Sequence, residues 1–155
     1  MRAFQNSVEA HFSDVASAFG SRLERLSPSL YGFLTHAAVV TVGVYHGHLP
    51  GVCVKIRCRE PRDMLDVDDT RDIGLANIVA FSDASEPRHG YPEHYWTKDS
   101  LDAELGRLAD YLQRYGKPFL TDVGADWRGL RAWLDERLKE TRTDWSWIEK
   151  RSQQS

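Results

Sequence analysis

The sequence predicts an α+β fold in which a small antiparallel sheet of about three or more strands is packed on one face by an N-terminal helix and two C-terminal helices. Three observations lead to this prediction. Apolar residues recur at helical spacing near both ends of the chain, an alternating apolar pattern runs through residues 38–58, and 155 residues suit one domain. We therefore expect a single domain over residues 1–155, with a polar C-terminal tail from about residue 149.

The first predicted helix carries one apolar stripe, at gaps of three and four residues, formed by Val8, Phe12, Val15, Phe19, Leu23 and Leu26. Ser27-Pro28 is expected to end this helix, because proline disfavours helical geometry in the residue before it. An amphipathic helix of this length buries its stripe against another layer, and a sheet is the simplest partner.

Two strands are predicted over residues 38–45 and 52–58, where apolar residues alternate with other residues. In the second strand one face holds Val52, Val54, Ile56 and Cys58, and the other holds Cys53, Lys55, Arg57 and Arg59. We expect an antiparallel hairpin with one face on the core and the other in water. The two cysteines would point to opposite faces, so they cannot form a disulfide with each other.

The middle of the chain is less regular. Residues 60–72 are rich in aspartate and predict an acidic connection. Ile73, Leu75, Val79 and Phe81 predict a third strand over residues 73–82, with a bulge or a hydrogen-bonded polar group at Asn77. Residues 83–97 contain two prolines and a glycine and predict a long loop.

Two further helices are predicted near the C-terminus. The first, capped by Asp99 or Ser100 and ended by Gly116 and Pro118, has a stripe of Leu101, Leu105, Leu108, Leu112 and Tyr115. The second begins near Asp126 and has a stripe of Trp127, Leu130, Leu134 and Leu138.

The composition argues against several classes of protein. A net charge of −3 gives no overall attraction to nucleic acid or to an anionic membrane. No apolar run approaches the roughly 20 residues that a membrane span needs, and the N-terminus lacks the apolar core of a signal peptide. We therefore expect a cytoplasmic protein that takes no cofactor, and a homodimer is one option.

Catalytic motifs are absent from the sequence, because it has no nucleophile elbow, phosphate-binding loop or dinucleotide-binding turn. Metal binding stays open through loop histidines, the candidate ligands being His46, His48, His89 and His94. The alternative function is therefore a small metal-dependent hydrolase that uses these histidines and the acidic residues 63–72.

The favoured function is a non-catalytic protein-binding domain. Lys55, Arg57 and Arg59 form a row of cations on one face of the second strand, and the neighbouring strand offers Tyr45 but no acid to pair with them. Further candidate contacts are Tyr95 and Trp96 of the long loop and Trp133 at the flank of the last helix. Small intracellular bacterial proteins with this outline are often immunity proteins, antitoxins or adaptors, which is an analogy at the level of the fold alone.

Overall fold

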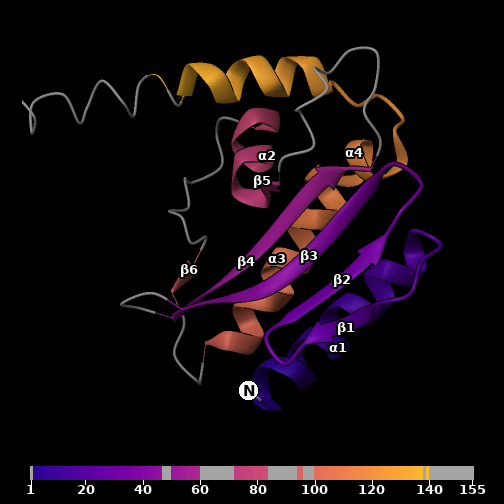
Figure 1. Ribbon diagram of the computed structural model, residues 1–155, viewed down its shortest axis with the longest axis vertical. Helices are drawn as coiled ribbons and strands as arrows, with labels where there is room; N and C mark the ends of the chain where they lie inside the picture. The colour runs from indigo at the N-terminus through magenta and orange to yellow at the C-terminus, as the bar shows by residue number, and fades with distance from the viewer. Residues whose placement is uncertain are drawn as a thin grey trace, which may run out of the picture. The chain divides into compact units, whose positions relative to one another are not determined.

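The computed structural model describes residues 2–46, 50–59, 72–83, 94–95, 100–137 and 139 (Figure 1). The side chains of residues 45, 46, 50, 94 and 95 lie outside this description, as do the acidic connection, most of the long loop and the C-terminal tail. The chain divides into two compact units, Met1–Ala125 and Asp126–Ser155, which are described separately. The single domain stays a prediction.

The first unit has an α+β fold, as the sequence predicts. Its described strands are β1 (Glu24–Ser27), β2 (Leu30–Leu34), β3 (Ala38–His46), β4 (Pro50–Cys58), β5 (Ile73–Gly74) and β6 (His94–Tyr95). They form one antiparallel sheet in the order β1-β2-β3-β4-β5, with β6 also paired to β4. Its described helices are α1 (Arg2–Ala18), α2 (Leu75–Ser82), α3 (Leu101–Tyr115) and α4 (Lys117–Thr121). Figure 1 shows α1 and α3 behind the sheet, so both cover the same face.

The first predicted helix is confirmed as α1, but its extension to Leu26 is wrong. The buried stripe of Val8, Phe12 and Val15 is confirmed. The helix then ends in a Schellman motif, in which the amide of Ser21 donates to the carbonyl of Ala16 and the amide of Gly20 donates to that of Ser17. Gly20 adopts φ of 70°, which glycine reaches without steric cost.

The two strands that follow α1 were not predicted. Leu26 continues the helical spacing by coincidence, but it lies in the edge strand β1 and is 57% exposed. In strand β2, Tyr31 and Phe33 have buried side chains, whereas Leu34 is exposed. Ser27 pairs with Leu30, and the register between the two strands is irregular between Arg25 and Ser27.

The predicted hairpin is confirmed as β3 and β4, with antiparallel register throughout. Its core face is made of paired residues with small or β-branched side chains: Ala38 opposite Cys58, Val40 opposite Ile56, Val42 opposite Val54, and Val44 opposite Val52. On the buried side of β2, Tyr31 continues this layer opposite Val42 and Phe33 continues it opposite Val40. Both cysteines are buried thiols, one on each face of β4, as expected.

The strand predicted over residues 73–82 is wrong except for its first two residues. Only β5 is extended, and α2 starts at Leu75. Leu75, Ile78 and Val79 are buried together because spacings of three and four put them on one side of a helix. Asn77 lies within that helix, so the bulge predicted there is also wrong.

Helix α3 confirms its predicted stripe, with Leu101, Leu105, Leu108 and Leu112 all buried. Ser100 occupies the N-cap without a side-chain capping bond, and Gly116 follows the last turn. The Tyr115 hydroxyl donates to the Asp83 carboxylate at 3.2 Å, which joins the ends of α3 and α2. No helix in the described part of the chain combines the length and apolar character that a membrane crossing requires.

In the second unit, residues 127–137 are helical, and the predicted start near Asp126 is confirmed. The Asp126 carboxylate accepts a hydrogen bond from the Gly129 amide at 2.9 Å, which is the geometry of an N-cap. Trp127 and Leu130 of the predicted stripe are buried, and Leu134 is half-buried.

Candidate functional site

The face of the sheet opposite α1 and α3, here called the outer face, is organised in three cross-strand rows. The strand registers define a first row of Leu34, Val39 and Arg57, a second row of Glu24, Gly32, Thr41 and Lys55, and a third row of Leu30, Gly43 and Cys53. Glycines therefore stand where β2 and β3 would otherwise present side chains. This face turns toward the viewer in Figure 1.

One hollow of about 320 Å³ lies over Gly32, and we call it the Gly32 hollow. Its apolar walls come from Leu26, Leu34 and Val39, and Arg22 and Glu24 contribute charge. Leu26 and Leu34 are 57% and 51% exposed, and they are two of the three large apolar side chains that are exposed in the described part of the chain. Exposed apolar side chains gathered around a hollow are typical of contact sites.

A second hollow of about 290 Å³ lies over Gly43, and we call it the Gly43 hollow. It is lined by Leu30 on one side and by Cys53, Lys55 and Asp72 on the other. Thr41 lines both hollows, so they are neighbours on the outer face.

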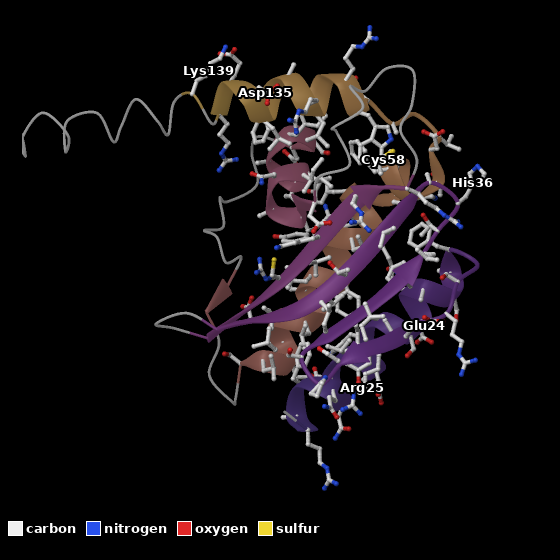
Figure 2. All side chains as sticks on the ribbon, viewed as in Figure 1. Glu24, Arg25, His36, Cys58, Asp135 and Lys139 are labelled. Atoms are coloured by element: carbon white, nitrogen blue, oxygen red, sulfur yellow. The ribbon has the colours of Figure 1, made fainter. Side chains whose placement is uncertain are left out.

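The predicted cations occupy three different environments. Arg57 is exposed on the outer face, and its guanidinium has no hydrogen-bond or ion-pair partner among the described residues. Lys55 is half-buried and lines the Gly43 hollow together with Asp72. Asp72 precedes β5, so this acid does not come from the neighbouring strand β3, where the sequence predicts none. Figure 2 shows Glu24, the acid of the other hollow, on the edge strand β1.

Arg59 holds a turn in place instead of extending the cation row across the outer face. Its guanidinium donates to the carbonyl of Thr35 at 3.1 Å, and its amide donates to the carbonyl of Ala37 at 2.9 Å. These bonds tie the end of β4 to the turn between β2 and β3, the turn that carries His36 in Figure 2. The outer face therefore offers Lys55 and Arg57 as its cations on β4.

The structure brings two of the predicted aromatic residues into one row of the sheet. Tyr45 of β3 and Tyr95 of β6 both pair with Gly51 of β4, one from each side. Sequence reasoning missed this row because β6 comes from a distant part of the chain. Trp96 lies outside the described residues.

Trp133 belongs to the second unit, where it is half-buried. The Arg137 guanidinium lies over its indole ring, 5.0 Å from the centroid. Such cation–π contacts cover one face of the ring. One face of the Trp133 ring is therefore covered by a residue of the same helix.

The candidate metal ligands are only partly described. The backbone of His46 pairs with Pro50, and that of His94 pairs with Val52, so both lie at the hairpin end of β4. His48 and His89 fall outside the described residues, as do residues 63–71 of the acidic segment. Among the described side chains, no group of three or more His, Cys, Asp or Glu residues has the arrangement of a metal site.

A polar cluster that the sequence did not reveal joins α1 to α3. The hydroxyl of Ser7 donates to Oδ1 of Asp102 at 2.6 Å, and Nε2 of His11 lies 2.9 Å from the same oxygen. A nucleophilic triad requires the histidine to lie between the serine and the acid. Here the acid lies between the other two, so the cluster is a clamp between helices. Ser7 and His11 are one helical turn apart on α1, and this spacing is the sequence signal of the cluster.

The pKa of Asp102 is lowered, first by the hydrogen bond from Ser7 and then by that from His11. An acid with a lowered pKa stabilises the fold above its unfolded pKa of about 4, and this contribution is lost as the pH falls through the folded pKa. We expect Asp102→Asn to lower the midpoint of urea unfolding at pH 5, and we expect the two proteins to converge toward pH 2.5.

Asp110→Asn is the matched control, because Asp110 is exposed on the same helix and lies 3.9 Å from Arg114. Urea titrations of the three proteins at successive pH values make the comparison. A deficit for Asp102→Asn that stays constant from pH 5 to pH 2.5 would show that the clamp does not act through the ionised carboxylate.

Comparison of the chain with protein-family models, with curated proteins and with solved structures gave no significant match.

Proposed function

We propose that this chain is a non-catalytic protein-binding domain that docks a partner on the outer face of its sheet. The observation that carries the proposal is the combination, on one face, of two adjacent hollows, two half-exposed leucines and an exposed arginine. Interfaces of this kind have an apolar centre that gains energy from burial and a charged rim that orients the partner. Arg57 and Lys55 would supply that rim.

The proposal extends to the aromatic residues and to the class of protein. Tyr45 and Tyr95 would widen the contact at the hairpin end of β4, where both pair with Gly51. Trp96 and Trp133 are further candidate contacts. A cytoplasmic immunity protein, antitoxin or adaptor would use such a face to hold one partner, and no cofactor enters this function.

The test is affinity capture from the source cells with a tagged chain, followed by quantitative mass spectrometry of the proteins retained. Two variants change the outer face: Leu34→Glu places a charge in the wall of the Gly32 hollow, and Arg57→Glu reverses the rim charge. We expect one retained protein to be lost at least tenfold in both variants, because a buried or repelled charge costs more than about 1.4 kcal/mol.

Two matched controls make the same chemical changes elsewhere. Val123→Glu alters an apolar side chain that is 75% exposed, and Lys117→Glu reverses an exposed cation at the start of α4. Both controls should retain the partner, and all four variants should keep the melting temperature of the parent. Equal recovery of every retained protein with all five baits would refute the proposal.

A further inference from the structure

Gly32 and Gly43 are diagonal neighbours on adjacent strands. Gly32 pairs with Thr41, and Gly43 lies two residues further along β3, on the same face. Diagonal neighbours of this kind are about 7–8 Å apart. A glycine inside a strand weakens it and often marks the close approach of a ligand or of another chain.

Neither glycine is required by its backbone conformation. Among the described glycines, positive φ values occur at Gly20 and Gly124, not in the strands. A Cβ atom at Gly32 would lie 3.1 Å from the carbonyl oxygen of Val40, so backbone packing accounts for that glycine.

Gly43 has no comparable packing reason. A Cβ atom there would meet Cδ1 of Leu30 at 3.1 Å, which is the end of a flexible side chain, and the Ser29 carbonyl at an ordinary 3.5 Å. Leu30 can move by the few tenths of an ångström needed. Glycine at this position thus lowers strand stability and leaves the Gly43 hollow open.

The size of the outer face favours a small occupant. Strands β1 to β4 span about 14 Å and the three rows about 13 Å, so the patch measures on the order of 200 Å². A standard protein–protein interface buries about 800 Å² on each partner. The patch therefore suits a short segment of a partner better than the broad face of a second copy of this chain.

We propose that the two hollows bind two apolar side chains, at positions i and i+2, from an extended acidic segment of a partner protein. In an extended chain these side chains lie on one face, about 6.6–6.8 Å apart, which matches the diagonal from Gly32 to Gly43. On the same face of the segment, an acidic side chain two residues beyond the one in the Gly32 hollow would approach Arg22, which lines that hollow. This inference rests on the proposed function and names the chemistry of the partner.

The test uses the purified, ¹⁵N-labelled full chain and a defined probe, the blocked heptapeptide Glu-Ser-Leu-Ser-Leu-Ser-Glu. Its leucines and glutamates all lie on one face when it is extended. We expect saturable amide shifts centred on Gly32, Thr41 and Gly43. The isomer Glu-Ser-Leu-Leu-Ser-Ser-Glu, whose leucines point to opposite faces, and the version with lysine at both ends should each bind at least several-fold more weakly.

Two variants of the chain complete the test. Gly43→Ala should weaken binding of the first peptide about tenfold, since a single extra methyl group in an apolar pocket has an effect of that order. The melting temperature of Gly43→Ala should not fall. The weaker binding would then result from the methyl group that occupies the Gly43 hollow and not from unfolding. Arg22→Gln should also weaken binding, whereas Lys117→Gln should not.

Three outcomes would overturn the inference. The first is equal binding of the two leucine isomers, or no binding of either; the second is unchanged binding to Gly43→Ala. The third is concentration-dependent dimerisation in sedimentation equilibrium that Gly43→Ala abolishes, which would assign the face to a second copy. If the peptide fails while a captured protein is still lost with Leu34→Glu and Arg57→Glu, the proposed function stands and only the extended segment is refuted.

Discussion

Replacement of Tyr31 by alanine is expected to lower the free energy of unfolding by about 3–5 kcal/mol, the range for removing a large buried aromatic side chain. Tyr31 is 2% exposed, and its ring meets that of Phe4 edge-on at a centroid distance of 6.2 Å. The phenol hydroxyl donates to the Glu9 carboxylate at 2.8 Å. This one side chain therefore joins β2 to α1 by both packing and a hydrogen bond.

Two further variants separate these contributions. Tyr31→Phe removes only the hydrogen bond and should cost about 1 kcal/mol. Leu34→Ala, on the opposite face of β2, should cost about 1 kcal/mol or less because Leu34 is half-exposed already. Urea unfolding followed by circular dichroism gives all three values. A Tyr31→Ala protein no less stable than Leu34→Ala would show that the layers are not joined here.

Ionisation of Tyr31 is expected to lower the stability of the fold at high pH. Burial, and then the hydrogen bond to Glu9, raise the pKa of Tyr31 above its usual value. A group with a raised pKa contributes its stabilisation fully below its unfolded pKa of about 10 and loses it as the pH rises through the folded pKa. The part of the stability that depends on the Tyr31 hydroxyl is therefore constant at neutral pH.

Thr35→Val is expected to lower the free energy of unfolding by about 2–3 kcal/mol, although valine has nearly the same shape as threonine. The Thr35 hydroxyl oxygen accepts hydrogen bonds from the amides of Ala37 and Ala38, at 3.3 and 3.0 Å. All three residues are buried, so water cannot replace the lost acceptor. The turn between β2 and β3 would be left with two unpaired buried amides.

Thr35→Ser is the control, because it keeps the hydroxyl and should cost only about 1 kcal/mol for the missing methyl group. Urea unfolding measures both losses, and hydrogen exchange at Ala37 and Ala38 should accelerate in the valine variant alone. If valine and serine prove equally stable, the hydroxyl is not what holds this turn. Arg59 would be affected too, since its guanidinium binds the carbonyl of Thr35.

Part of the fold could be predicted from the sequence because the signal was local. The stripe from Val8 to Val15, the alternation through β3 and β4 and the stripe of α3 each repeat at the period of their own element. The end of α1 was also readable, at Gly20, but the continued spacing of Leu23 and Leu26 obscured it. Similarly, Leu75, Ile78 and Val79 have helical spacing, and the strand predicted there is wrong.

The candidate site was predicted only in part. Alternation along β4 placed Lys55 and Arg57 on one face, and the structure adds the hollows beside them. The sequence could not reveal those hollows, because each depends on a glycine in one strand and on leucines in its neighbour. The row of Tyr45, Gly51 and Tyr95 depends in the same way on a strand pairing across more than forty residues.

The sequence by itself determined the α+β class, the hairpin of β3 and β4, and the cationic character of one side of β4. These follow from backbone periodicity, which depends only on residues close together in the chain. The tertiary structure alone decided that Leu26 and Leu34 stand exposed around a hollow, that Arg59 is used to hold a turn, and that Ser7, His11 and Asp102 meet. Those features depend on strand register and on which face the helices cover, and both are set by contacts between distant residues.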